Sequence, residues 1–381
     1  MATSNTLTGI IPVIYEAMNV VSREQVGLIS ACTIDAAAAR AAVGQTVRSP
    51  VGAVGALEDI TPGQLPAASG GTTTGYKDVV ITKSKAAPIL WSGEEQLSVG
   101  SMLNPILVNQ FAEGMRLLTN AIEVDLALTA ATHASRAYGT AGTTPFGTAG
   151  DLSDFAGVLQ ILEDNGAPKS DLQIGLNSAA MGKLRGKQSV LFKVNEAGSS
   201  DMLRNGMTDR VQGFALRNSA GLKVSTPGSG ASYVTNGIQA VGATVIAVQT
   251  GTGTIVPGDV ISFAADTANK YVVTGALAGG NVTIALPGLK VAIPTGNAVT
   301  VSGAYTPNVA FARTALVLAA RAPALPDGGD MAIDRTSVSD PVTGMSFEVS
   351  LYRQYRQIKY ELACAWGTAS VKDEHIATLL G

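Results

Sequence analysis

Charge is scarce in this chain. Of its 381 residues, 14% are Asp, Glu, Lys or Arg, and the formal net charge is −3. A protein that grips DNA or RNA needs an excess of Lys and Arg to neutralise phosphates. The composition therefore excludes a dedicated nucleic-acid binder, and we expect only weak, non-specific contact with nucleic acid.

Cysteine is equally scarce, with Cys32 and Cys364 as the two examples. Two cysteines so far apart form neither a metal motif nor a disulfide framework, which indicates a reducing cytoplasm as the folding compartment. We expect both to be packing residues. Aromatic residues make up 5% of the chain whereas Gly and Ala are abundant, a composition that suits a surface covered by partners.

Long uncharged apolar runs are missing as well. The N-terminal stretch 1–25 has no Lys or Arg before Arg23, and Glu16 interrupts its apolar part, so it does not fit a secretory signal. The most apolar later run, 308–325, contains two arginines and falls short of the roughly 20 apolar residues that cross a bilayer. No membrane segment is predicted.

The sequence also lacks the motifs of common enzymes. His133 and His375 have no HExxH neighbourhood, "GTGTIV" at Gly251 lacks the third glycine of a dinucleotide fingerprint, and "MGKLRGKQ" has the wrong spacing for a phosphate loop. The carboxylate pairs Glu94/Glu95 and Glu123/Asp125 are interpreted as solvated helix faces. We therefore predict no catalytic, cofactor-binding or metal-binding residue and no enzyme activity.

Helical periodicity is strong in one place and weaker in two others. The helix expected over 105–131 follows an aliphatic stripe with a spacing of three or four residues. Its members are Val99, Leu103, Leu107, Phe111, Met115, Leu118, Ile122 and Leu126. Residues 10–43 are also expected to be helical, and 151–188 reads as helix, strand and short helix, which is typical of an α/β domain.

The segment 45–93 reads as a long two-stranded arm with a Pro-, Gly- and Thr-rich middle. A lone ribbon is marginally stable in water, so it needs a surface to lie on. Lys77, Lys83 and Lys85 have two interpretations there. They are either solvated charges that protect a strand edge, or partners for acidic groups of a neighbouring subunit.

A second β region covers 233–304 and holds only four charged residues between positions 236 and 303. Five or six short strands separated by Gly and Pro turns predict a small closed barrel. Because α/β character resumes after it and two alternating strands follow in 345–367, we interpret the barrel as an inserted domain.

The order of these features resembles the major capsid proteins of tailed bacteriophages. Residues 76–127 look like that family's returning arm strand, aromatic-plus-acidic turn and spine helix, and "DRVQGFALRNSAGL" resembles its Gly-Phe strand. "VPGDVISFA" is similar to a signature of the extra barrel in podovirus-type coat proteins, and 354–380 resembles their closing strand and tail.

The resemblance implies an α+β fold of the Hong Kong 97 type. Its expected parts are an N-terminal arm and helix (1–44), an extended arm loop (45–93), a peripheral domain with the spine helix (94–150), an axial domain in two pieces (151–232 and 305–340), an inserted barrel (233–304), and peripheral C-terminal strands with a tail (341–381).

The function implied is structural. Identical subunits would form hexamers and pentamers of an icosahedral head around packaged double-stranded DNA, with a scaffolding protein and a portal as partners and the host cytoplasm as the place of assembly. Candidates for inter-subunit contacts are Arg48, Lys77, Lys83, Lys85, Trp91, Glu94, Glu95, Asp266 and Lys270.

For the barrel, two interpretations stay open: a module that stabilises the axial domain, or a loop in which Asp266 and Lys270 bridge to a subunit across a two-fold axis. The alternatives for the whole chain are an α/β enzyme with a β accessory domain, another structural subunit from a phage tail or surface layer, and a non-viral compartment shell.

Overall fold

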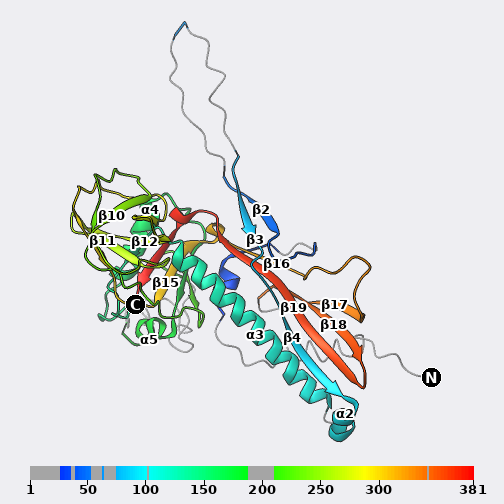
Figure 1. Ribbon diagram of the computed structural model, residues 1–381. Coiled ribbons are helices and arrows are strands. Elements are labelled where there is room, and N and C mark those ends of the chain that lie inside the picture. The colour runs from blue at the N-terminus through cyan, green and yellow to red at the C-terminus, as the bar shows by residue number, and fades with distance from the viewer. Residues whose placement is uncertain are drawn as a thin grey trace.

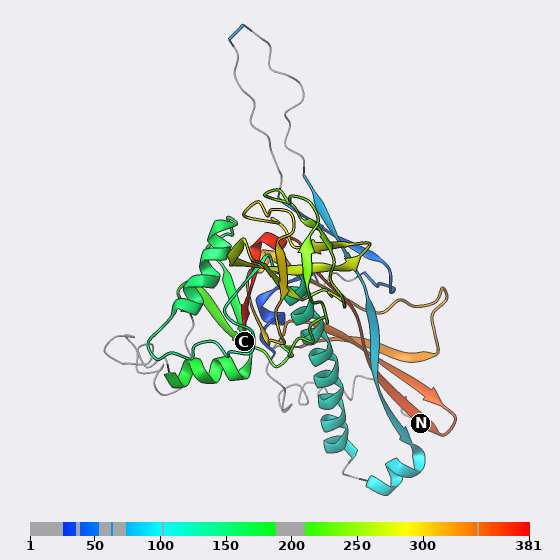
Figure 2. The ribbon, with the colours of Figure 1, turned by 60° about the vertical axis from the view of Figure 1, so that its left-hand side comes forward.

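A computed structural model describes residues 26–35, 39–52, 62–63, 74–100, 103–187, 210–340 and 343–381. Within these residues the chain is a mixed α/β structure in which one long helix accompanies two large sheets and a separate two-stranded sheet (Figure 1). A ring of short strands lies near the C-terminal end of that helix in both views (Figures 1 and 2).

The long helix is α3 (Leu103–Thr132), which confirms the helix expected over 105–131. At 1.5 Å per residue it is about 45 Å long. Its aliphatic stripe is buried from Leu107 to Leu126 and packs on the first sheet. The periodicity therefore marks core, as such a stripe usually does.

The first sheet has the order β1-β16-β19-β18-β17, with β4 on the free side of β19. The long strands β18 and β19 confirm the two strands expected near the C-terminus. The bounds are β1 (Thr33–Asp35), β4 (Lys83–Ser92), β16 (Leu316–Arg321), β17 (Ala332–Ser339), β18 (Ser346–Gln354) and β19 (Gln357–Ser370).

Strand β4 differs from its expected place in the arm. It pairs antiparallel with β19 from Ser92 opposite Gln357 to Lys83 opposite Trp366. Within the described structure β4 pairs with β19 on one side and with no strand on the other, so it is an edge strand. An edge strand tolerates a proline such as Pro88. The alternation of apolar residues in this stretch comes from packing on α3 and not from a free ribbon.

The second sheet carries α4 (Ser153–Asp164) and α5 (Ser178–Lys187) and confirms the α/β character of 151–188. Its order is β12-β5-β20-β15-β6-β8-β7. The bounds are β5 (Arg136–Tyr138), β6 (Leu172–Leu176), β7 (Arg210–Val211), β8 (Phe214–Asn218), β12 (Asp266–Ala278), β15 (Pro307–Ala312) and β20 (Ile376–Leu380).

Strand β12 also belongs to a ring of six strands. Pairing runs β12-β13-β10-β9-β14-β11 and returns to β12, so the ring has no open edge. The remaining bounds are β9 (Tyr233–Thr235), β10 (Val245–Gln249), β11 (Val260–Phe263), β13 (Asn281–Ile284) and β14 (Ala298–Val301). A compact apolar core that includes Phe263, Tyr271 and Ile293 fills it.

The helix expected over 10–43 is wrong for the part that the structure describes, and 10–25 and 36–38 lie outside it. Residues Ile29–Ala31 form one 3-10 turn (η2), β1 follows, and Ala41 bridges to Pro323. Tertiary pairing of β1 with β16 overrides the helix propensity of the alanine-rich sequence.

The glutamate at position 123 corrects a second expectation. Its side chain is 2% exposed, not solvated, and accepts hydrogen bonds from the backbone N–H groups of Gly27, Leu28 and Ile29 at 2.9, 2.9 and 3.1 Å. The Ser219 hydroxyl donates a fourth at 2.6 Å. One carboxylate thus joins α3, the segment before β1 and the segment after β8.

The cysteines behave as expected, because Cys32 and Cys364 are both buried and unbridged, and burial raises the pKa of each thiol to about 12. His375 is buried. None of the helices within the described ranges combines the length and apolarity needed to cross a membrane.

Candidate subunit-contact surface

The described part of the arm is a two-stranded ribbon, β2 (Thr46–Pro50) with β3 (Tyr76–Val80), which extends away from the body (Figures 1 and 2). Its base is anchored, since Val79 and Ile81 pack against the first sheet. Farther out, Arg48 contacts Asp78 at 3.2 Å and lies 4.2 Å from the Tyr76 ring centre. Tyr76 and Lys77, on the outer part of the ribbon, are exposed within the described structure.

The other two lysines lie on β4. The Nζ atom of Lys83 is 2.6 Å from Asp125 Oδ1 on α3, an intramolecular ion pair that neither interpretation of the sequence included. Asp125 Oδ2 accepts from the Trp366 indole at 2.8 Å, so this carboxylate is half-buried and not simply solvated. Lys85 is exposed.

A groove of about 490 Å³ runs between β4 and α3. Lys85 and Leu90 line it from the strand, and Glu113 and Leu117 line it from the helix. Leu90 and Leu117 are 47% and 53% exposed, so the groove offers apolar surface beside an unpaired strand edge. Such an edge is a template for an added strand.

At the far end of β4 the chain turns into α2 (Gly93–Val99). Ser92 and Glu95 form a capping box, in which the Glu95 N–H donates to Ser92 Oγ at 3.2 Å and Glu95 Oε2 accepts from the Ser92 N–H at 2.7 Å. These hydrogen bonds lower the pKa of Glu95. Glu94 is exposed, whereas Trp91 is buried and donates to Gln110 at 2.8 Å.

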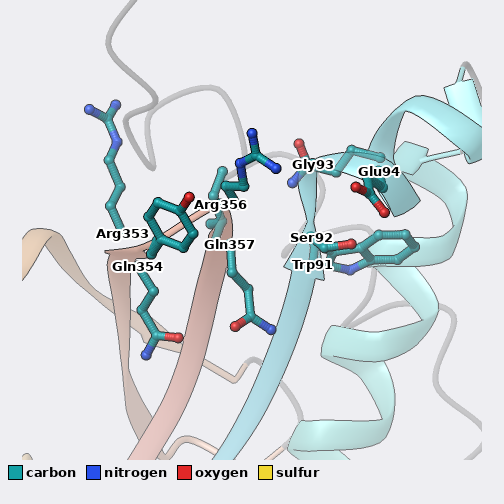
Figure 3. A pocket seen from close by; sticks show the side chains of 11 residues that line it. Trp91, Ser92, Gly93, Glu94, Arg353, Gln354, Arg356 and Gln357 are labelled. Atoms are coloured by element: carbon teal, nitrogen blue, oxygen red, sulfur yellow. The ribbon is translucent and has the colours of Figure 1, made fainter.

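A cleft of about 830 Å³ separates this turn from the β18–β19 hairpin. Figure 3 shows Arg353 and Arg356 projecting from the hairpin on one side and Glu94 on the other. Tyr355 at the hairpin tip is 91% exposed. Neither arginine has an acidic partner within the described residues. We call this region the tip cleft.

Sequence reasoning missed the arginines of the tip cleft. The available signal was the polar cluster "RQYRQ" between two alternating strands, which predicts an exposed hairpin turn rich in cations. The strand pairing shows why this cluster matters, because it places the turn beside Glu94, which lies more than 250 positions earlier in the chain.

The structure places Asp266 and Lys270 in β12 and not in the loop expected for them, and their bridge to a subunit across a two-fold axis stays a prediction. Asp266 is 5% exposed and accepts from the Tyr271 hydroxyl at 2.6 Å. Lys270 donates to the Gly139 carbonyl, and burial lowers its pKa. Both side chains are therefore engaged within their own chain.

Metal-ligand side chains do not gather in groups of three or more anywhere in the described ranges. His133 Nδ1 lies 3.4 Å from Asp373, and burial together with Lys372 lowers the pKa of His375. The described ranges expose the β2–β3 ribbon, the groove between β4 and α3, and the charged tip cleft. Surfaces of these kinds make contacts between macromolecules.

No protein-family model matches the chain, and no curated protein sequence does. Solved structures do. The chain in the capsid structure of the cyanophage P-SCSP1u aligns with a TM-score of 0.51 at 10% identity, over 94% of this chain and 88% of that chain. An archaeal virus-like particle from Pyrococcus furiosus aligns at 0.41 and 10%, over 97% and 96%. The asymmetric unit of the bacteriophage PhiM1 mature capsid aligns at 0.47 and 9%, over 92% and 85%.

The chain thus has the overall fold of the subunit in the cyanophage capsid structure, which bears out the mixed α/β architecture that the resemblance implied.

Proposed function

We propose that the chain is the major capsid protein of a tailed phage and that its copies form the hexamers and pentamers of an icosahedral head enclosing double-stranded DNA. The observation that carries the proposal is the fold shared with a cyanophage capsid subunit over 94% of the chain. The ribbon and tip cleft support it, because Lys77 on the ribbon and Arg353 and Arg356 at the cleft have no acidic partner among the described residues.

In this proposal the ribbon of one copy lies on the groove between β4 and α3 of the next. The ribbon is anchored at its base and exposed farther out, while the groove has apolar walls and a free strand edge. A ribbon that gains its packing from a neighbour couples its ordering to assembly. Arg48, Lys77 and Lys85 then belong to the contact and set its register.

The tip cleft supplies a second contact, in which Arg353 and Arg356 of one copy face Glu94 of another. Head-to-tail contacts between identical copies generate closed rings when the rotation closes. Trp91 and Glu95 support this contact from within, since one packs under the cleft and the other caps α2.

The division into N-terminal arm, arm loop, peripheral domain, axial domain and inserted barrel is part of the same proposal. The closed ring of strands β9 to β14 supports the inserted barrel. The pairing of β4 (Lys83–Ser92) with β19 assigns β4 to the peripheral domain and not to the arm loop. The proposal also includes two partners, a scaffolding protein and a portal, and weak contact with the packaged DNA. Assembly takes place in the host cytoplasm, and the protein ends as part of the virion.

The test is negative-stain electron microscopy of the chain expressed alone and with its scaffolding protein. Closed shells are the expected result. Monodisperse monomers under every condition would contradict the proposal and favour the enzyme alternative. Open tubes or flat lattices would favour a tail or surface-layer subunit.

A further inference from the structure

Three Asn-Gly dipeptides occur in the sequence. Two lie within the described residues, at 165–166 and 236–237, and the third, at 205–206, lies outside them. The nitrogen of such a glycine can attack the asparagine side chain, because glycine has no Cβ atom to hinder the approach. The reaction needs an asparagine side chain and a glycine N–H that are not held in hydrogen bonds, so the fold decides which dipeptide reacts.

The dipeptide at 165–166 is held on both sides. The side-chain amide of Asn165 donates to Ser135 Oγ at 3.1 Å and to the Glu374 carbonyl at 2.8 Å. The Gly166 N–H donates to the Glu163 carbonyl at 3.0 Å. Attack would require these three hydrogen bonds to open together, so the folded chain protects Asn165.

The dipeptide at 236–237 follows β9 and is free at both reacting groups. The Asn236 side chain is exposed and makes no hydrogen bond with any described residue. The Gly237 N–H likewise finds no acceptor in the described part of the chain. Because an exposed side chain changes rotamer rapidly, the Asn236 amide can turn toward the nitrogen.

The hydrogen bonds around this dipeptide favour the attack. The Gln239 side-chain amide donates to the carbonyls of Asn236 and Gly237 at 2.9 and 3.2 Å. A hydrogen bond to the Asn236 carbonyl polarises the peptide group that it shares with the Gly237 N–H, which makes that N–H more acidic. Gln239 thus fixes the carbonyls of the turn and leaves the attacking nitrogen without a partner.

We propose that Asn236, and not Asn165, deamidates spontaneously in the folded chain, with water as the co-reactant. The Gly237 nitrogen loses its proton to solvent and forms a bond to Asn236 Cγ, and the Cγ–Nδ2 bond breaks to release ammonia. The resulting five-membered succinimide adds one water at either carbonyl, and cleavage of that C–N bond leaves aspartate or isoaspartate. One water enters and one ammonia leaves, with no oxidation or reduction.

The products change the turn in two ways. Either product adds a negative charge to an exposed position, in a chain whose formal net charge is −3. Isoaspartate also lengthens the main chain by one atom. That atom enters between the Asn236 N–H, which donates to the Ala247 carbonyl at 2.8 Å, and the Gln239 N–H, which donates to the Ile293 carbonyl at 2.8 Å. The connection that follows β9 therefore alters as the molecule ages.

Mass spectrometry of proteolytic peptides tests the site, after incubation of the purified full-length chain at physiological temperature and pH. The peptide with Asn236 should gain about 1 Da, and an isoaspartyl carboxyl methyltransferase should label its isoaspartate fraction. Asn165 is the internal control and should react at least about tenfold more slowly, because its hydrogen bonds have to open first. In urea, which unfolds both dipeptides, the two rates should become similar.

Asn236→Gln is the matched variant, since the Asn236 side chain makes no hydrogen bond that the change would remove. Its longer side chain would have to close a six-membered ring, so the mass gain and the label on this peptide should disappear. A folded-chain rate at Asn236 no higher than at Asn165, or a difference that persists unchanged in urea, would overturn the inference. The measurement needs neither particles nor a partner, so its outcome is independent of the proposed function.

Discussion

At the scale of single residues, Glu123 has the most consequential environment in the described structure. A buried carboxylate without hydrogen bonds would be very costly, but this one accepts four, and three come from consecutive backbone N–H groups. It satisfies the start of the η2 turn in the way that a capping residue satisfies a helix, although it comes from another element. The close approach also explains Gly221, where a Cβ atom would lie 2.8 Å from the Glu123 side chain.

Replacing Glu123 with Gln should lower the free energy of unfolding by about 1.5 to 3 kcal/mol, the usual value of hydrogen bonds to a charged group. The amide nitrogen would face backbone donors instead of accepting from them. Urea unfolding followed by tryptophan fluorescence measures the loss. Glu113→Gln, on the exposed face of the same helix, should change stability by less than about 1 kcal/mol. Equal effects of the two substitutions would contradict this account.

The same carboxylate predicts a pH dependence. Burial raises the pKa of Glu123 above its ordinary value of 4.5. The folded chain therefore binds a proton here at a pH where the unfolded chain does not, so the stability contributed by this site rises as pH falls through the raised pKa toward 4.5 and declines as pH rises. The difference in unfolding free energy between wild type and Glu123→Gln should grow in that window, and a constant difference would be inconsistent with a raised pKa.

At the scale of elements, the ring is tied to the rest of the molecule by β12 and by one arginine. Arg136, on β5, is 4% exposed and donates to Asn269 of β12 at 2.9 Å and to Asp164 of α4 at 3.2 Å. The guanidinium lowers the pKa of Asp164, and Lys290 from the ring approaches the same carboxylate. This cluster fixes the ring against the second sheet.

Replacing Arg136 with Met should loosen that junction. Amide hydrogen exchange in 266–272 should become faster by about tenfold or more, while exchange in α4 changes little, because local opening is governed by the contacts of each unit. Lys169→Met, which removes an exposed ion pair with Glu163, is the control and should leave both regions unchanged. Uniformly faster exchange would mean that Arg136 stabilises the whole molecule and not this junction.

The elements also show what the sequence could and could not predict. Helix α3 and the ring strands have strong local periodicity, so their patterns identified them. Strands β1 and β4 were assigned wrongly because their conformation depends on β16 and β19, which come more than 250 positions later. The Glu123 site has no sequence pattern, since its partners are backbone N–H groups about 95 residues away.

At the scale of the whole molecule, the contact surfaces proposed here lie at separate places. The β18–β19 hairpin and the six-strand ring are at opposite ends, and the β2–β3 ribbon extends in a third direction (Figure 1). A subunit with contacts in several directions can occupy a closed lattice, whereas one with a single contact surface stops at a dimer. Low overall charge keeps repulsion between such closely packed copies small.

The tip cleft gives the sharpest test of this arrangement. Replacing Arg356 with Glu should prevent closed particles, because a carboxylate would then face Glu94 of the next copy, and like charges at a contact are strongly unfavourable. Adding Glu94→Arg should restore assembly by exchanging the two charges. The exchange uses Glu94 and not Glu95, since Glu95 caps α2 and its loss would disturb the helix itself.

Light scattering and electron microscopy follow wild type and the two variants. Lys223→Glu controls for charge alone, because Lys223 is exposed and does not line the cleft. Recovery in the double variant would show that the two groups interact directly, since two independent defects add and do not cancel. Recovery on mixing Arg356→Glu with Glu94→Arg would place that contact between copies, because each single variant has like charges within its own cleft. Assembly should also weaken as salt concentration rises, because exposed charges are screened beyond about 8 Å at physiological ionic strength. If the double variant assembles no better than Arg356→Glu, the two groups do not face each other across subunits, and the tip cleft is not a contact of this kind.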